Sequence, residues 1–387
     1  MSLLRLALAQ LAHDRLGQLL NLLLLALGVA LAAFLLQLRT QFEQRLTREA
    51  RGVDLVLGAK GSPLQLVLSS LYHLDVPTGN IRLSEARRWG AHPMVAEAIP
   101  LSLGDSWAGH RIVGTTPAYL RLSGATVGEG RLWRAPLEAV VGASVPLAVG
   151  ARFAGAHGLS GGEAHDQGQY TVVGRLPAGL GSLDRLILTD LASVWLLHGG
   201  PAADPRAPDA AREITALLIR YATPLAAASL PQTIQRESSL QAASPAFELT
   251  RLRALVGVGV ELLQALAGLL LAVAALGVFV TLYRALEARQ YDLALLRAMG
   301  ASRAELAGLL LFEAQILALA GGLLGLLLSH GTLALLALQS RGAIEPAAPL
   351  GAEIHLLLLV QLIAALAVIL PALRAYRLPV ADTLSRR

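Results

Sequence analysis

The chain has 387 residues, of which 55% are hydrophobic and 15% are charged, and its formal net charge is +5. A soluble globular domain is about 45–50% apolar and about 25% charged, so this balance indicates a membrane protein. The 32 Lys and Arg residues are scattered and only 4% of residues are aromatic, which argues against a nucleic-acid partner. Cysteine is absent, which excludes a disulfide framework and a thiolate metal site.

Four segments are long and apolar enough to cross a bilayer, which requires about 20 mostly apolar residues in a helix. Residues 16–38, 314–340 and 354–373 contain no Asp, Glu, Lys or Arg, and residues 254–283 contain only Glu261. The first run exceeds the apolar region of a cleaved signal peptide, which favours an uncleaved signal anchor. We predict transmembrane helices at 16–38, 254–283, 306–338 and 354–373.

The arginines of the short connecting segments predict the orientation of these helices. Four arginines lie in residues 284–305 and four in the tail 374–387, whereas the loop 339–353 contains only Arg341. Both termini (1–15 and 374–387) and residues 284–305 are therefore expected in the cytoplasm. Arginines also follow the first span on the opposite side, but long translocated domains escape this rule.

Residues 39–252 are expected to form an extracytoplasmic domain, and their sequence pattern predicts a mixed α/β fold. Gly, Pro and Asp turn signals separate its short β-rich runs. We predict strands at 112–115, 139–141, 170–173, 186–189 and 214–221, helices at 84–91 and 231–242, and a flexible loop at 201–211. The predicted fold is an α-helical membrane protein with four transmembrane helices, one before and three after a large α/β domain.

The chain carries none of the common catalytic motifs. The segment from Gly58 to Ser62 lacks the contiguous Gly-Lys-Ser/Thr of a phosphate-binding loop, so we expect no ATP binding by this chain. One cluster could ligate a borderline metal, but it lies in a Gly-rich loop that is more typical of a solvated surface. The members of this weak candidate site are His157, Glu163, His165 and Asp166. An enzyme that uses a metal ion at this site is the least favoured interpretation, and we expect no catalysis by this chain.

Residues 284–305 have the pattern of a short amphipathic helix. Leu286, Leu293, Leu296 and Met299 recur near helical spacing among charged residues. Gly300 is placed to end this helix. Ser302 and Glu305 have the spacing of a capping box for the next helix. The segment is either a docking helix for a cytoplasmic protein or an interfacial helix without a partner. In the third span, Gly321 and Gly325 predict a face that lets helices approach closely.

The segment beginning at Glu287 reads Glu-Ala-Arg-Gln-Tyr-Asp-Leu-Ala-Leu-Leu-Arg-Ala-Met-Gly-Ala. It resembles the FtsX-like, or MacB-type, permease family of ABC systems, whose members carry Glu-Arg-Arg-x-Glu-hydrophobic-x-x-Leu-Arg-Ala-Leu-Gly-Ala after the second span. Leu295, Arg297, Ala298, Gly300 and Ala301 match, whereas Tyr291-Asp292 and Met299 depart from the pattern. The resemblance implies that the ATPase is contacted by Glu287, Arg289, Asp292, Leu295, Arg297, Met299, Gly300 and Ala301.

The same resemblance extends to the one-plus-three topology and to outer-domain phrases. It implies a multi-pass protein of the bacterial inner membrane, in contact with its lipids, that works with a separate cytoplasmic ABC ATPase and a second permease copy. ATP and Mg²⁺ would bind the ATPase, and this chain would bind no cofactor. A periplasmic adaptor or lipoprotein would be a further partner. The implied function is mechanotransmission for export or extraction of cargo; the alternative is a regulatory permease that activates a periplasmic cell-wall hydrolase.

Residues 54–80 contain Lys60, the only lysine of the chain. The segment is similar to a subgroup of peptide- or lipoprotein-type ABC permeases. Because arginine serves everywhere else, this position either requires a compact ammonium group or is a chance survivor. The candidate functional residues of the outer domain are Lys60, Ser62, His73, Asp75, Thr78 and Asn80.

Overall fold

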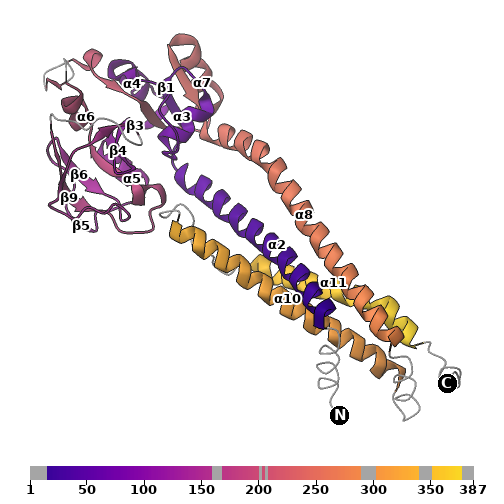
Figure 1. Cartoon of the computed structure of the whole chain (residues 1–387). Coiled ribbons are helices and arrows are strands. Elements are labelled where there is room, and N and C mark those ends of the chain that lie inside the picture. Colours follow the sequence, from indigo (N-terminus) through magenta and orange to yellow (C-terminus); the bar gives the residue numbers. More distant parts are fainter. Residues whose placement is uncertain are drawn as a thin grey trace, which may run out of the picture. The chain divides into compact units, whose positions relative to one another are not determined.

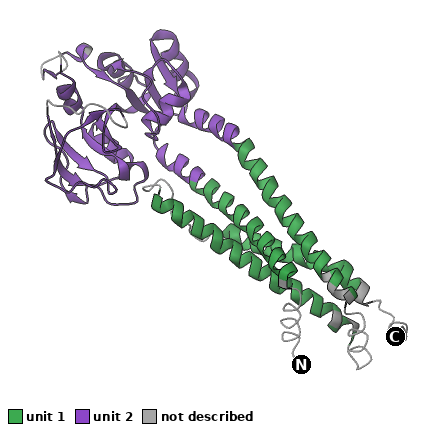
Figure 2. Ribbon diagram, in the orientation of Figure 1, with its two compact units in different colours: residues 1–41, 257–387 green, residues 42–256 purple. Residues whose placement is uncertain are grey.

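The computed structural model describes residues 15–158, 168–199, 203–204, 208–288, 302–339 and 351–376 (Figure 1). The chain divides into two compact units (Figure 2). A helical unit comprises Met1–Gln41 and Gly257–Arg387, and an α/β unit comprises Phe42–Val256. We call them the membrane unit and the outer unit.

Four long helices carry the apolar segments of the sequence, and among the described residues these are the helices able to span a membrane. They are α2 (Arg15–Glu49), α8 (Pro245–Ala288), α10 (Arg303–Gln339) and α11 (Gly351–Tyr376). One precedes and three follow the sheet-rich unit, which confirms the predicted fold class. At 1.5 Å per residue, α2 is about 52 Å long and α8 about 66 Å. Both therefore exceed the hydrocarbon core of a bilayer, which is about 30 Å thick.

Small residues set a close contact between two helices of the membrane unit. A Cβ atom added to Gly325 would lie 2.7 Å from the carbonyl oxygen of Ala26 and 2.7 Å from Val29 Cβ. A Cβ on Gly321 would meet the side chain of Leu25 at 2.7 Å. Helix α10 therefore packs directly on α2, as the spacing of Gly321 and Gly325 predicts. Close approach through small residues is a usual basis of helix association in lipid.

Polar side chains add a second set of contacts between these helices. Asn21 on α2 donates a 2.7 Å hydrogen bond from Nδ2 to Thr281 Oγ1 on α8. Gln37 Nε2 on α2 donates to Glu353 Oε1 on α11 at 2.7 Å, and His330 Nε2 on α10 lies 2.9 Å from the same oxygen. Buried polar groups in a membrane protein bond to one another because lipid offers no alternative partner. Helix α2 is thus linked to each of the other three helices.

The outer unit is built on a mixed sheet, which is continuous in the strand order β13-β1-β12-β3-β4-β10-β6-β9-β5. These strands are β13 (Leu240–Ala243), β1 (Leu55–Ala59), β12 (Ala216–Tyr221), β3 (Val95–Trp107), β4 (His110–Thr115), β10 (Ile187–Asp190), β6 (Glu138–Val141), β9 (Tyr170–Arg175) and β5 (Glu129–Gly130). Two short strands pair off this path, β7 (Arg152–Phe153) with β9 and β8 (Ala156–His157) with β3, while β2 (Ile81–Arg82) pairs with β11 (Glu213–Ile214). All five predicted strands overlap observed ones.

Helices cover this sheet, and one of them corrects the sequence prediction. The helix predicted at 231–242 is wrong at its end, because α7 (Ala226–Glu237) stops and β13 follows. Ser238 accounts for the break, since its Oγ accepts a 3.2 Å hydrogen bond from Leu240 N outside the helix. The predicted helix at 84–91 is α4 (Leu83–Gly90). The helices α3 (Pro63–Ser70), α5 (Pro117–Leu122) and α6 (Leu191–His198) are too short to show a clear period in the sequence.

Candidate functional site

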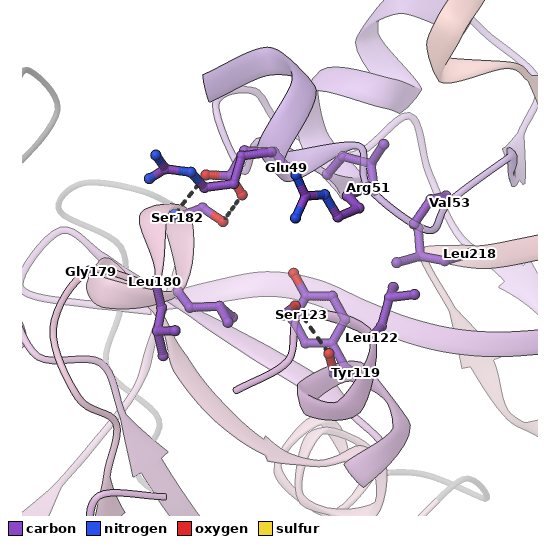
Figure 3. A pocket seen from close by; sticks show the side chains of 13 residues that line it. Glu49, Arg51, Val53, Tyr119, Leu122, Ser123, Gly179, Leu180, Ser182 and Leu218 are labelled. Atoms are coloured by element: carbon purple, nitrogen blue, oxygen red, sulfur yellow. Dashed lines mark hydrogen bonds between the residues drawn. The ribbon is translucent and has the colours of Figure 1, made fainter. Parts of the chain in front are cut away.

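A pocket of about 260 Å³ lies in the outer unit, beside the last turn of α2 (Figure 3). Its polar lining includes Arg48 and Glu49 from the end of that helix, Arg51 two residues beyond it, and Ser182. Its apolar lining comes from Val53, Leu71, Tyr119, Leu122, Leu180, Leu183 and Leu218. The pocket thus has both polar and apolar walls, and clefts in which a few polar groups converge are common binding sites.

Glu49, the last residue of α2, fastens that helix to the wall of the pocket. Its carboxylate accepts a 2.7 Å hydrogen bond from Ser182 N and another from Ser182 Oγ. Ser182 lies in a short 3-10 helix, η1 (Gly181–Arg185), whose first N–H groups have no partner within the helix. Gly181 has φ +72°, and a Cβ there would lie 2.7 Å from Glu49 Oε1. Glycine at 181 is therefore needed both for the backbone and for the approach of Glu49.

His73 connects the candidate segment of the sequence to the pocket. Its Nε2 lies 2.9 Å from the hydroxyl of Tyr119, which is a lining residue. Burial, and to a smaller extent the nearby Arg111 and Arg185, lower the pKa of His73 to about 3. Burial also raises the pKa of Tyr119. Both rings are therefore neutral at pH 7, and they supply hydrogen-bonding groups without charge.

Arg111, on β4, is a charged group held inside the outer unit. Only 5% of its surface is exposed, and its Nε and Nη2 have no hydrogen-bond partner among the described residues. Burial lowers the pKa of this guanidinium, while the carboxylate of Asp75 raises it. A buried charge without full hydrogen bonding is costly. Arg111 is therefore the strongest candidate in the outer unit for contacting an anionic group.

The six candidate residues of the outer domain separate into three groups. Ser62 caps α3 by accepting from Gln65 N at 3.3 Å, Thr78 Oγ1 donates to Ala59 O at 3.2 Å, and Asn80 Nδ2 donates to Glu213 Oε2 at 3.0 Å. These contacts stabilise the local fold. Lys60 is exposed in the turn after β1. His73 and Asp75 instead belong to the surroundings of Arg111, whose importance the sequence did not indicate because arginine is common along the chain.

Neutral His73 predicts an acid-sensitive outer unit. The folded-state pKa lies near 3 and the unfolded-state value near 6.5, so the unfolded chain binds the extra proton between these values. The contribution of His73 to stability is then complete above pH 6.5 and falls by about 1.4 kcal/mol per pH unit as the pH drops toward 3. Thermal unfolding of the full chain followed by near-ultraviolet circular dichroism would measure this slope. His73→Gln should flatten it and His92→Gln should not; an unchanged slope in His73→Gln would contradict the assignment.

The predicted ATPase-contacting segment is described only at its first end, and the description resumes at residue 302, directly before α10. Glu287 is exposed near the end of α8. The residues Arg289, Asp292, Leu295, Arg297, Met299, Gly300 and Ala301 lie outside the described residues. Just after the segment, Ser302 N donates to Glu305 Oε2 at 2.7 Å and Glu305 N donates to Ser302 Oγ at 3.2 Å. This reciprocal pair confirms the capping box predicted at the start of α10.

The weak metal cluster is likewise only partly described. His157 is exposed on β8, and Glu163, His165 and Asp166 lie outside the described residues. The structure places His157 beside Asp105 and His198 instead, which are distant from it in the sequence.

Residues 265–380 match the family model described as FtsX-like permease C-terminal. No curated protein matches the chain. Among solved structures it is similar to the periplasmic region of MacB from Actinobacillus actinomycetemcomitans, with 12% identity and a TM-score of 0.35 over 54% of this chain and 98% of that one. It is also similar to the extracellular domain of the noncanonic ABC-type transporter YknZ from Gram-positive bacteria, with 10% identity and a TM-score of 0.29 over 49% of this chain and 99% of that one. The match at residues 265–380 confirms the expected resemblance to the FtsX-like permeases over that part of the chain.

Proposed function

We propose that the chain is the membrane subunit of an ABC system of the mechanotransmission type. A separate cytoplasmic ATPase binds ATP and Mg²⁺ and contacts the segment from Glu287 to Ala301. Two copies of the permease, or this chain with a related one, work with two ATPases in the bacterial inner membrane. The termini and the ATPase-contacting segment lie in the cytoplasm, and the outer unit lies on the other side.

The observation that carries this proposal is the continuity of two helices. Helix α2 has residues in both units, and so does α8, without an interruption in either. A continuous helix transmits displacement along its axis because its backbone hydrogen bonds resist bending. At its outer end α2 is fastened to η1 through Glu49. Displacement of the membrane helices would therefore change the walls of the pocket.

Contacts within the membrane unit support joint movement of α2 and α8. A Cβ on Gly28 would lie 3.0 Å from the side chain of Leu271, and one on Gly277 would lie 2.3 Å from Asn21 Oδ1. The hydrogen bond from Asn21 to Thr281 joins the same two helices. Packed elements of this kind have few alternative arrangements and move as units.

The outer unit would act on cargo for export or extraction, such as a peptide, a lipoprotein, a lipid or a small molecule. The alternative is a regulatory permease that activates a cell-wall hydrolase without cargo. The buried guanidinium of Arg111 favours the first, because it suits recognition of an anionic group. A surface that only docks a protein needs no buried cation that lacks hydrogen bonds. An adaptor or lipoprotein on the outer unit is compatible with either function.

Leu295→Asp is expected to release the ATPase while leaving the permease inserted in the membrane. The apolar face of an amphipathic helix needs a partner surface, and a carboxylate in such an interface costs several kcal/mol. Co-purification of the ATPase with the tagged permease measures the effect, and we expect at least a tenfold loss. Leu225→Asp is the matched control, since Leu225 is an exposed leucine of the outer unit. Equal ATPase recovery from both variants would show that this segment is not the docking element.

A further inference from the structure

Three side chains with metal-binding groups meet at one edge of the outer unit. Asp105 lies on β3, His157 on β8 and His198 at the end of α6. One ligand atom from each lies within 4.8 Å of those of the other two. His157 Nδ1 is 3.2 Å from Asp105 Oδ1, and His198 Nε2 is 3.5 Å from the same oxygen. Two imidazoles and one carboxylate therefore converge on a common point.

Local backbone features bring these residues together. The pairing of β3 with β4 shifts register between Leu103 and Ser106, which indicates a bulge. Gly104, inside the bulge, has φ +153°, a conformation that residues with side chains rarely adopt. Asp105, also inside the bulge, lies directly opposite His157 in the antiparallel pair of β3 and β8. Directly opposed residues have Cβ atoms about 4.5–5.5 Å apart, so the two side chains meet.

The hydrogen bond on the far side of His198 selects its tautomer. His198 Nδ1 lies 2.7 Å from the carbonyl oxygen of Val194. A carbonyl oxygen only accepts, so Nδ1 carries the proton. In a neutral ring the Nε2 lone pair then faces Asp105. Metal-binding histidines are oriented in this way, with the other ring nitrogen donating to a backbone carbonyl or a carboxylate.

The distances agree with a tetrahedral site. Zn²⁺ binds histidine nitrogen and carboxylate oxygen at about 2.0–2.2 Å, which places adjacent ligand atoms about 3.3–3.5 Å apart. The two separations from Asp105, 3.2 Å and 3.5 Å, are close to this edge length, and the two histidine nitrogens lie within 4.8 Å of each other. Asp105 is 3% exposed at its side chain, whereas His157 is 57% exposed. The site therefore has a fixed carboxylate at its base and is open to solvent at the two rings.

We propose that Asp105, His157 and His198 form a binding site for a divalent transition-metal ion, with Zn²⁺ as its best match. Imidazole together with one carboxylate favours Zn²⁺ over Mg²⁺ or Ca²⁺, which prefer oxygen ligands. Three protein ligands leave one position for water or for a ligand atom of another molecule. The ion would link the end of α6 to β3 and β8.

The competing explanation is a simple ion pair between Asp105 and a protonated histidine. The Asp105 carboxylate raises the pKa of His198, which agrees with such a pair. However, an ion pair with Asp105 requires only one protonated histidine and does not account for the second. The centroids of the His157 and His198 rings lie 5.2 Å apart. Two imidazolium rings so close would repel each other. A single metal ion binds both neutral rings and the carboxylate at once, which accounts for all three positions.

The test is a Zn²⁺ titration of the full chain, purified through a tag without histidine, against a chromogenic chelator. We expect one Zn²⁺ per chain and no competition from Mg²⁺. Asp105→Asn, His157→Gln and His198→Gln should each lower the affinity at least about 100-fold, the upper end of the loss seen when a supporting partner is removed. His92→Gln is the matched control and should keep the wild-type affinity, because His92 lies outside the cluster.

The exposed position of His157 makes His157→Gln the decisive variant, since this substitution leaves the fold intact. Co²⁺ provides a second readout, because a tetrahedral site gives intense visible absorption that should be lost in the same variants. Absence of stoichiometric binding by the wild-type chain would overturn the proposal. Wild-type affinity in His157→Gln would overturn it as well.

Discussion

Gly325→Ala is expected to destabilise the membrane unit by about 1–3 kcal/mol, the usual effect of overpacking a close contact. The added methyl group would lie 2.7 Å from the carbonyl oxygen of Ala26. A backbone oxygen cannot rotate away as a side chain can, so α2 or α10 must shift. Gly321→Ala should have a smaller effect, because its nearest neighbour is the flexible side chain of Leu25.

The matched control for this prediction lies on the same helix. A Cβ on Gly331 would have nothing within 4 Å. Gly331→Ala should therefore be neutral or stabilising, since alanine favours a helix by about 1 kcal/mol over glycine. Each variant would be unfolded in mixed micelles by raising the proportion of a denaturing detergent. The unfolding curves would give the differences in the free energy of unfolding. Equal destabilisation by Gly325→Ala and Gly331→Ala would mean that α2 and α10 do not approach each other in this way.

Arg111→Met is expected to abolish transport while leaving the outer unit as stable as before or more stable. Taking a charge out of water costs several kcal/mol unless good ion pairing and hydrogen bonds offset it, and an apolar side chain of similar size does not have this cost. Arg111 fits this case because its Nε and Nη2 have no hydrogen-bond partner among the described residues. The loss of function follows from loss of the group that contacts an anionic ligand.

Two measurements decide this second prediction, the thermal midpoint of the purified chain and growth complementation in a strain that lacks the permease. Arg220→Met is the matched control. Arg220 pairs with Glu97 at 3.1 Å on the surface, and exposed pairs contribute about 0.2–1 kcal/mol. It should complement fully and unfold almost as the wild type does. A destabilised but fully active Arg111→Met would make Arg111 a structural residue.

The sequence was most informative where the physical signal is local. Charge-free apolar runs predict the membrane helices directly, since lipid tolerates no unpaired charge. The capping box at Ser302 and Glu305 and the close approach at Gly325 also follow from short spacings. The strands of the outer unit could also be predicted from a local signal, because turn residues flank each of their β-rich runs.

The sites could not be predicted because their members are far apart in the chain. Asp105 and His198 meet only through a bulge in β3 and the end of α6, and neither position carries a signature. The sequence pointed to His157 only as part of a cluster with Glu163, His165 and Asp166, which are its neighbours along the chain. Arg111 is one arginine among many until the fold buries it. The strand β13 was missed because its apolar residues continue the helical pattern of α7.

The central claim is that ATP binding in the cytoplasm moves the outer unit. Because the chain has no cysteine, a single Thr223→Cys on the exposed surface of the outer unit can carry a spin label without background. The account predicts that the label-to-label distance distribution in permease pairs, reconstituted with the ATPase in lipid nanodiscs, shifts when ATP replaces ADP. The shift should disappear in Leu295→Asp. An unchanged distribution in the wild-type complex while it hydrolyses ATP would contradict mechanotransmission.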